Sequence, residues 1–372
     1  MKFQTELPPV INFGRGIRFR LPELLPDGRV VVICGRHSEE RIRAEIIPRL
    51  RPGVEAEIFG GFPAEVPLDA VSEVRDMVRR VSATAVVGWG GGSAIDGAKA
   101  VAVLANFPGS VEEAFYGRGK PVGREIFFAA VPTTAGTGAE ITPNAVLCDP
   151  ATGIKQSLRA PGMTADVALV DPELAAEAPP SVFAASAFDA LTQALESFIS
   201  RRADALSRLL ARAAADELWS GLSAIAADGG HRTDAAVDRI VHGSMLAGSA
   251  FVSSGLGAVH GIAHPVGGRR HVPHGIACAV LLTAVLRRNL GAATPQLREL
   301  ALLLCGNDDP ERLIEAIAIR RRQFGLPADF REYGLTEQDI PFIVANCRSG
   351  SMKSNPCDLS DEEVAEIVRE LI

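Results

Sequence analysis

The stretch AVVGWGGGSAIDGAKAVAVL, residues 85–104, decides the fold of the first half of the chain. It begins with a short apolar run typical of a buried strand, passes through a glycine-rich loop and continues as a helix of small residues. Glycine lets the backbone approach a phosphate closely, and a helix N-terminus offers free N–H groups and the positive end of the helix dipole. The unit therefore predicts phosphate binding, although its spacing is not G-x-G-x-x-G and a tight structural turn would also require glycine.

Strand and helix patterns alternate on both sides of this stretch. Apolar runs at 29–34, 126–131 and 167–170 predict further strands, and 39–50 predicts a helix. This alternation indicates a mainly parallel sheet flanked by helices. The segment PTTAGTGAE, residues 132–140, follows one of these strands, and its threonine hydroxyls and glycine N–H groups suit a diphosphate or ribose, or form only a loop. Because ligands bind at the carboxyl ends of parallel strands, we expect both loops at one crevice.

After Pro179-Pro180 the pattern becomes helical. The sequence predicts an α/β N-terminal domain, residues 1–178, and an all-α C-terminal domain, residues 179–372. Helices are expected at 181–198, 203–226, 234–264, 276–290, 295–305, 310–324, 336–346 and 360–371.

Composition narrows the class of protein. A net charge of −7 without a basic cluster argues against a nucleic-acid partner. No run reaches the roughly 18–20 uninterrupted apolar residues of a membrane helix, and the N-terminus lacks the apolar core of a signal peptide. Six scattered cysteines without a C-x-x-C pair indicate reduced thiols. We therefore expect a cytoplasmic protein with no membrane partner.

Four of the seven histidines lie in GAVHGIAHPVGGRRHVPHG, residues 257–275. His260 and His264 are four apart and share one face of a helix, whereas His274 follows Pro273 and is expected at a turn or a helix start. Imidazole is the commonest metal ligand and a frequent proton carrier near neutral pH. The cluster, which also contains His271, therefore predicts a metal or catalytic site.

Several motifs together identify a family. The chain resembles the iron-containing (group III, metal-dependent) alcohol dehydrogenases, and the matching motifs occur in family order over nearly the whole chain. The resemblance implies a cofactor domain, a helical domain, an active site in the cleft between them, and a homo-oligomer. The motifs are GGGSAID (90–96), PTTAGTGAE (132–140), DVALVDP (166–172), DALTQALE (189–196), GAVHGIAHPVGG (257–268), PHG (273–275) and SGSMKSNP (349–356).

The resemblance also implies roles for residues at matching positions. One set would bind the cofactor: Gly91, Gly92, Ser93 and Asp96 at the diphosphate, Thr133, Thr134 and Thr137 in the same cleft, and Lys155 near the nicotinamide ribose. Another set would hold the metal: Asp189, the residue at position 193, His260 and His274. His264 would lie beside the metal and handle a proton.

Position 193 departs from the family, because glutamine stands where histidine is usual. An amide oxygen is a weaker ligand than imidazole for Fe²⁺ or Zn²⁺. Three strong ligands remain, which is enough for a catalytic zinc site with an open position. We therefore predict one divalent metal, Fe²⁺ or Zn²⁺, with Gln193 as its fourth ligand. The alternative is a weakened or metal-free site in which Gln193 binds substrate.

The segment after the strand at 29–34 bears on cofactor choice. Many NAD-using relatives place aspartate there to hold the ribose 2′-hydroxyl, whereas this chain has Gly35, Arg36 and Ser38. A guanidinium in place of a carboxylate favours a 2′-phosphate. We therefore predict NADP(H) rather than NAD(H), unless Arg36 is only a solvated loop residue.

The predicted function is reversible oxidation of a small alcohol to an aldehyde or ketone, with His264 or His274 relaying the proton. Arg269 and Arg270 could bind a carboxylate, phosphate or phosphonate on the substrate, or could face solvent. Two related enzyme classes are alternatives: a maleylacetate reductase-like enzyme without metal, and a dehydroquinate synthase-like lyase. A binding protein without turnover is a third.

Overall fold

The computed structural model describes residues 5–372, which form two compact units. The sheet unit comprises residues 6–134 and 138–177. The helical unit comprises Ala135–Thr137 and Ala178–Ile372, together with Thr5. The division into domains 1–178 and 179–372 stays a prediction.

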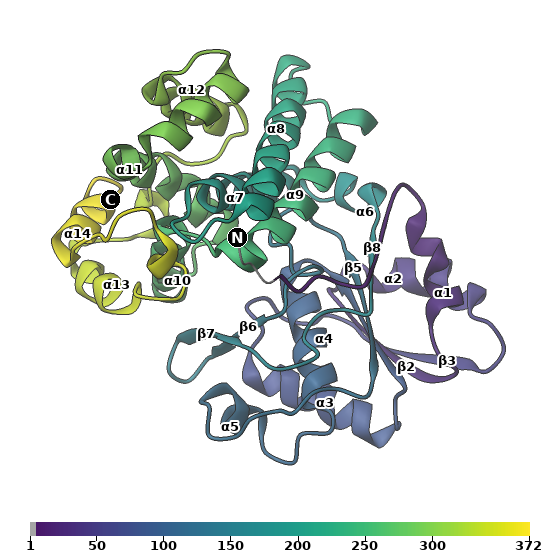
Figure 1. The fold of residues 1–372 in the computed structure, drawn as a ribbon. Coiled ribbons are helices and arrows are strands. Elements are labelled where there is room, and N and C mark those ends of the chain that lie inside the picture. The colour runs from purple at the N-terminus through teal and green to yellow at the C-terminus, as the bar shows by residue number, and fades with distance from the viewer. Residues whose placement is uncertain (1–4) are drawn as a thin grey trace. The chain divides into compact units, whose positions relative to one another are not determined.

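The sheet unit is built on six parallel strands in the order β1-β8-β5-β4-β2-β3. Figure 1 labels four of them, β2, β3, β5 and β8. The predicted α/β fold with a parallel sheet is confirmed. The strands are β1 (Val10–Phe13), β2 (Gly28–Cys34), β3 (Val54–Phe59), β4 (Ala85–Gly90), β5 (Phe127–Pro132) and β8 (Val167–Val170).

Helices cover both faces of this sheet. Successive side chains of a strand point to opposite faces, so Val31 and Ile33 pack with α3 (Leu68–Arg80) and α4 (Gly92–Leu104). Val30 and Val32 pack on the other side with residues of α1, of the π turn Ile42–Ile46 and of α6. Burial on both faces explains why the central strands read as nearly continuous apolar runs. The remaining helices of this unit are α1 (Leu21–Leu24), α2 (Glu39–Arg41), α5 (Val111–Phe115) and α6 (Pro172–Ala176).

Several elements of the sheet unit differ from the sequence prediction. The strands β1 and β3 were not predicted, nor was the antiparallel hairpin of β6 (Ala145–Asp149) and β7 (Ile154–Leu158). The predicted helix at 39–50 is only α2 followed by a π turn and a 3₁₀ turn. Pro48 lies in that last turn, and proline cannot donate the hydrogen bond that a regular α-helix requires.

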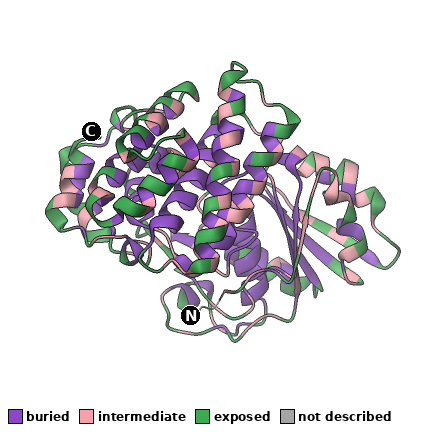
Figure 2. Ribbon diagram, turned by 45° about the horizontal axis from the view of Figure 1, so that its top comes forward, coloured by how far each residue is buried: buried purple, intermediate pink, exposed green. Residues whose placement is uncertain are grey.

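The helical unit confirms the predicted all-α second half. Its central helix, α7, is buried almost continuously from Phe183 to Ile199, and the inner helices are the most buried elements of this unit (Figure 2). The helices are α7 (Pro180–Ile199), α8 (Ala205–Ala227), α9 (Asp234–Ser254), α10 (Ala258–Arg270), α11 (His274–Cys305), α12 (Pro310–Gln323), α13 (Ile340–Asn346) and α14 (Asp361–Arg369).

The single helix predicted for 234–264 is wrong. The chain turns by 103° between α9 and α10. Gly255 makes this turn with φ +66°, and a Cβ there would lie 2.4 Å from Ser354 Oγ, so only glycine fits. The break places His260 and His264 on a separate helix that starts at Ala258.

The segment α11 consists of two helices that meet at a kink, with non-helical backbone at Ala293, in agreement with the two helices predicted for 276–290 and 295–305. By length and composition α11 could cross a membrane, and α9 with α10 would pass the same criterion as one bent span. However, 67% of the apolar window of α11 is buried inside the protein, as expected of a core helix.

Candidate metal centre and dinucleotide loops

Four possible metal ligands converge within the helical unit: Asp189 of α7, His260 of α10, and His274 and Cys278 of α11. One ligand atom from each side chain lies within 4.8 Å of the other three. The structure thus brings together three of the four predicted ligands. Cys278 was not predicted, although it lies one helical turn after His274.

The face of α7 that supplies Asp189 also carries Gln193 and Glu196, because residues at i, i+4 and i+7 align on a helix. Glu196 accepts hydrogen bonds from the Val259 N–H at 2.6 Å and from His260 Nδ1 at 2.6 Å. With Nδ1 held in this way, His260 Nε2 faces Asp189 Oδ1 at 3.3 Å. A carboxylate behind the ligating histidine is the usual means of fixing its tautomer in metal sites.

Glu196 was quoted in a family motif but not predicted as a site residue. Its position seven residues after Asp189, in an apolar stretch, is the sequence signal that could have identified it. The carboxylate is buried, and a buried carboxylate requires a partner.

The start of α11 lies close against α7. A Cβ on Gly275 would lie 2.3 Å from Ala185 O, so glycine permits this approach. His274, which begins α11 as predicted, thereby places Nε2 3.7 Å from Asp189 Oδ1. The P-H-G motif thus combines a ligand with the glycine that lets it reach the site.

The electrostatics of the cluster suit a cation. Burial opposes ionisation of Asp189, yet His274 and His260 outweigh it and lower the pKa of the carboxyl. Burial likewise opposes protonation of His260, but Cys278, Asp189 and Glu196 raise its pKa well above the usual value. Burial raises the pKa of the Cys278 thiol to about 12. Two buried carboxylates beside two imidazoles and a thiol are a donor set that fits a divalent metal.

Gln193 is buried beside these ligands. Its Oε1 has no hydrogen-bond partner among the residues that the structure describes. An unpaired buried amide oxygen is costly, so this atom is available to a metal, a water or a substrate. The ligand role predicted for Gln193 stays a prediction.

The other two clustered histidines differ in placement. The His264 ring stacks on the His274 ring, with centroids 5.4 Å apart and planes inclined by 22°. His271 is exposed and ends α10 in a left-handed conformation. The geometry therefore brings His264, and not His271, to the cluster.

Arg269 and Arg270 have a structural partner. Arg269 Nε donates to Asp339 Oδ1 at 2.9 Å, and Arg270 donates to Asp339 Oδ2 through Nε at 2.9 Å and Nη2 at 2.7 Å. The Asp339 side chain is fully buried. These bonds join the end of α10 to the start of α13, which accounts for both arginines without an anionic substrate.

In the sheet unit, β2 and β4 are neighbours. From β2 the chain continues to β3 on one side of this pair, and from β4 it continues to β5 on the other side. This is a topological switch point, where ligands bind in such sheets. The loop after β4 leads into α4, which starts at Gly92. Its N-cap residue, Gly91, has no side chain that could occupy the first N–H groups, and such a helix start suits an anion.

The loop after β5 lies beside the glycine loop. The Thr133 N–H donates to Gly90 O at 2.9 Å, and the Thr134 hydroxyl lies 3.4 Å from where a Gly91 Cβ would be. These predicted cofactor residues are therefore adjacent. Thr137 is grouped with the helical unit.

Asp96 has protein partners for both oxygens. Oδ2 accepts from the Val146 N–H at 2.9 Å, and Oδ1 lies 3.3 Å from Lys99 Nζ. Lys99 is buried and also donates to Ala139 O at 2.8 Å and Asn144 O at 2.7 Å. The pair fastens the segment after β5 to α4, and a cofactor contact by Asp96 stays a prediction.

Ser93 and Lys155 are connected through Glu65. Ser93 Oγ accepts from the Glu65 N–H at 3.2 Å, and Lys155 Nζ donates to Glu65 Oε1 at 2.7 Å. After β2, the Ser38 N–H donates to Gly35 O at 3.0 Å and closes a tight turn that leaves Arg36 exposed.

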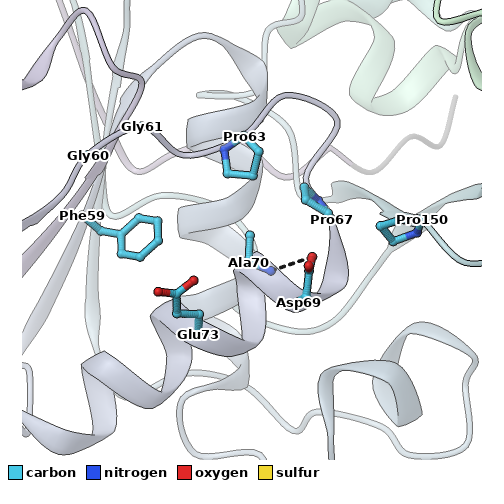
Figure 3. A pocket seen from close by; sticks show the side chains of 9 residues that line it. All are labelled: Phe59, Gly60, Gly61, Pro63, Pro67, Asp69, Ala70, Glu73 and Pro150. Carbon is cyan, nitrogen blue, oxygen red and sulfur yellow. Dashed lines mark hydrogen bonds between the residues drawn. The ribbon is translucent and has the colours of Figure 1, made fainter.

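An open pocket of about 500 Å³ lies where β3 ends and α3 begins (Figure 3). Asp69 Oδ1 accepts from the Ala70 N–H there, and the lining carries two carboxylates and no basic side chain. It therefore does not suit a phosphate, and it contains no predicted site residue. The lining residues are Phe59, Gly60, Gly61, Pro63, Pro67, Asp69, Ala70, Glu73 and Pro150.

Comparisons with known proteins cover nearly the whole chain. Residues 8–172 match the family described as iron-containing alcohol dehydrogenase, and residues 183–372 match the C-terminal part of the Fe-containing alcohol dehydrogenase family. The chain is 29% identical to the NAD-dependent methanol dehydrogenase of Bacillus methanolicus, over 98% of each protein. It is 32% identical to the 1-propanol dehydrogenase of Salmonella typhimurium, over 85% of each. A crystal structure of 1,3-propanediol oxidoreductase matches with a TM-score of 0.93 and 29% identity over 100% of both chains.

Proposed function

This chain belongs to the iron-containing alcohol dehydrogenase family, and on that premise we propose that it interconverts a small alcohol and its aldehyde or ketone by hydride transfer with a nicotinamide dinucleotide. The observation that carries the proposal is the convergence of Asp189, His260 and His274 in one buried cluster. The retained cluster and the alcohol dehydrogenase relatives do not favour the metal-free reductase or the lyase.

When bound, a divalent metal supplies a Lewis acid for the substrate oxygen, and the nicotinamide supplies or accepts the hydride. Asp189, His260 and His274 would hold Fe²⁺ or Zn²⁺, while Glu196 keeps His260 Nε2 turned toward Asp189. Gly91, Gly92 and the loop after β5 would bind the diphosphate.

We assign His274 to the ligands, since its Nε2 faces Asp189, and His264 to the proton step, since its ring stacks on His274. His264→Ala is expected to change the pH profile of kcat while leaving the bound metal content unchanged. An unchanged kcat and pH profile would remove His264 from the scheme.

For the cofactor we propose NADP(H), supported by the exposed Arg36 in the turn directly after β2 and by the absence of a carboxylate at position 35. The Bacillus methanolicus relative, in contrast, is named NAD-dependent. The test compares kcat/KM for NADPH and NADH in the wild type and in Arg36→Ala. We expect the variant to lose mainly the NADPH reaction; faster wild-type turnover with NADH would overturn the preference.

We propose a small alcohol or aldehyde as substrate, and a homo-oligomer in the cytoplasm. The arginine pair bound to Asp339 no longer supports an anionic substrate, so substrate charge is not part of the proposal. Light scattering of the purified protein tests the oligomer.

The decisive experiment is a panel of primary alcohols and aldehydes, run with both cofactors on protein of measured metal content. We expect reduced nicotinamide to be formed or consumed in stoichiometric amounts. A lyase would recycle its cofactor and show no net change, and full activity of metal-free protein would contradict a Lewis-acid role.

A further inference from the structure

The Cys278 thiol lies beside the two histidines of the candidate metal site. Its Sγ is 3.7 Å from His274 Nε2 and 3.8 Å from His260 Nε2, and the thiol is fully buried. Asp189 Oδ1 is 3.3 Å from His260 Nε2 and 3.7 Å from His274 Nε2.

These separations can be compared with the edges of a tetrahedral metal site. Bond lengths of about 2.0–2.1 Å to N and O and about 2.3 Å to S give edges of about 3.3 Å between N and O and about 3.6 Å between N and S. The observed N–O and N–S distances exceed these values by at most 0.4 Å. These four separations are compatible with a single metal ion, and the other two, between His260 and His274 and between Asp189 and Cys278, lie within 4.8 Å.

The position of the fourth donor differs from the one that the sequence predicts. Asp189 and Gln193 are one turn apart on α7, whereas His274 and Cys278 are one turn apart on α11. A thiolate is a far stronger ligand for zinc than an amide oxygen. At the position where the sequence predicts a fourth ligand, α7 carries the amide of Gln193. Its Oε1 has no hydrogen-bond partner among the residues that the structure describes.

We propose that Cys278 is the fourth protein ligand of the metal, beside Asp189, His260 and His274, and that the metal takes the substrate at a fifth position, an expansion that catalytic zinc sites allow. On binding, a bond forms between Sγ and the metal, and the thiol proton passes to solvent. A thiolate is a soft, polarizable ligand, and a site that contains one binds zinc in preference to Fe²⁺. This inference rests on the proposed metal-dependent function.

The test is X-ray absorption spectroscopy of the full-length protein loaded with zinc. We expect one sulfur scatterer at about 2.3 Å beside nitrogen and oxygen at about 2.0–2.1 Å. Zinc bound by nitrogen and oxygen alone would overturn the role of Cys278 while leaving the metal-dependent function intact. A protein that binds no metal would overturn both.

Two serine variants supply a matched comparison. Cys278→Ser is expected to lose the sulfur scatterer and to bind zinc at least about tenfold more weakly, since loss of even an outer partner costs about 10–100-fold. Cys347→Ser removes another buried thiol of the helical unit, outside the cluster. We expect this variant to keep both the sulfur scatterer and the zinc affinity of the wild type. If Cys278→Ser fails to fold, the wild-type spectrum alone decides.

Discussion

Glu196 accepts hydrogen bonds from both His260 Nδ1 and the Val259 N–H, so one carboxylate fixes the ring and the first turn of α10. Glu196→Gln keeps the size of the side chain but removes the charge that holds this tautomer. We expect zinc affinity to fall about 10–100-fold, measured by competition with a chromogenic chelator. Glu362→Gln, on the exposed face of α14, serves as the control. Equal affinities in the two variants would contradict the assigned role.

Gly275 sets the approach of α11 to α7. In Gly275→Ala the new methyl would meet Ala185 O, so α11 must move and His274 must leave Asp189. We expect a loss of about 1–3 kcal/mol in the free energy of unfolding, together with weaker metal binding.

Gly291→Ala is the matched control, because it lies on the same helix and its Cβ would meet nothing within 4 Å. There we expect a gain of up to about 1 kcal/mol from helix propensity. Urea unfolding measures both variants, and a similar result for the two would show that the contact with Ala185 is unimportant.

At the scale of elements, α10 is tied at both ends. Asn355 Oδ1 accepts from the Ala258 N–H at its start, and Arg269 and Arg270 bind Asp339 at its end. The motif SGSMKSNP therefore acts partly through Asn355, which also pairs with Asn289. Segments distant in the chain thus fix both ends of the helix that carries His260 and His264.

The bond to Asp339 makes stability depend on pH. Burial opposes ionisation, but Arg270, the Thr336 N–H and Arg269 lower the pKa of Asp339 to about 2. With an unfolded pKa of about 3.9, the wild type should exceed Asp339→Asn by about 2 kcal/mol at pH 7. Because the pKa of Asp339 is lower in the folded protein than in the unfolded chain, its carboxylate stabilises the fold at pH values above the unfolded pKa. The difference in stability between the wild type and Asp339→Asn should therefore shrink as the pH falls from about 4 to about 2. Urea midpoints across that range measure it, and a constant difference would contradict the assignment.

At the scale of the molecule, the metal cluster lies wholly within the helical unit, and the sheet unit has its own core. Removing the metal should therefore loosen α7, α10 and α11 more than the strands. A metal at a thousand times its Kd contributes about 4 kcal/mol. Chelation should lower Tm and speed amide hydrogen exchange in those three helices, while exchange in β2, β4 and β5 stays unchanged. Equal acceleration in both units would count against this localisation.

The sequence predicted those elements whose signals are local, and it missed elements that depend on contacts between residues far apart in the chain. The strands β2, β4, β5 and β8 carry continuous apolar runs and were predicted, whereas β3 reads VEAEIF at a sheet edge and was not. The turn at Gly255 was missed although a glycine after a helical stretch is a local signal for a helix end; the Ser354 side chain, which leaves no room for a Cβ there, lies far away in the chain.

The sequence by itself determined the parallel sheet and the helical second half, because these depend on local periodicity. It also located the glycine-rich loop and the histidine cluster through short motifs, whereas Asp189 was named as a ligand only through the family resemblance. Only the tertiary structure decided which side chains complete the cluster. Glu196 and Asp189 meet His260 across 64 and 71 residues, and Cys278 reaches it from another helix. Such contacts arise from the packing of α7, α10 and α11, which no local spacing in the chain specifies.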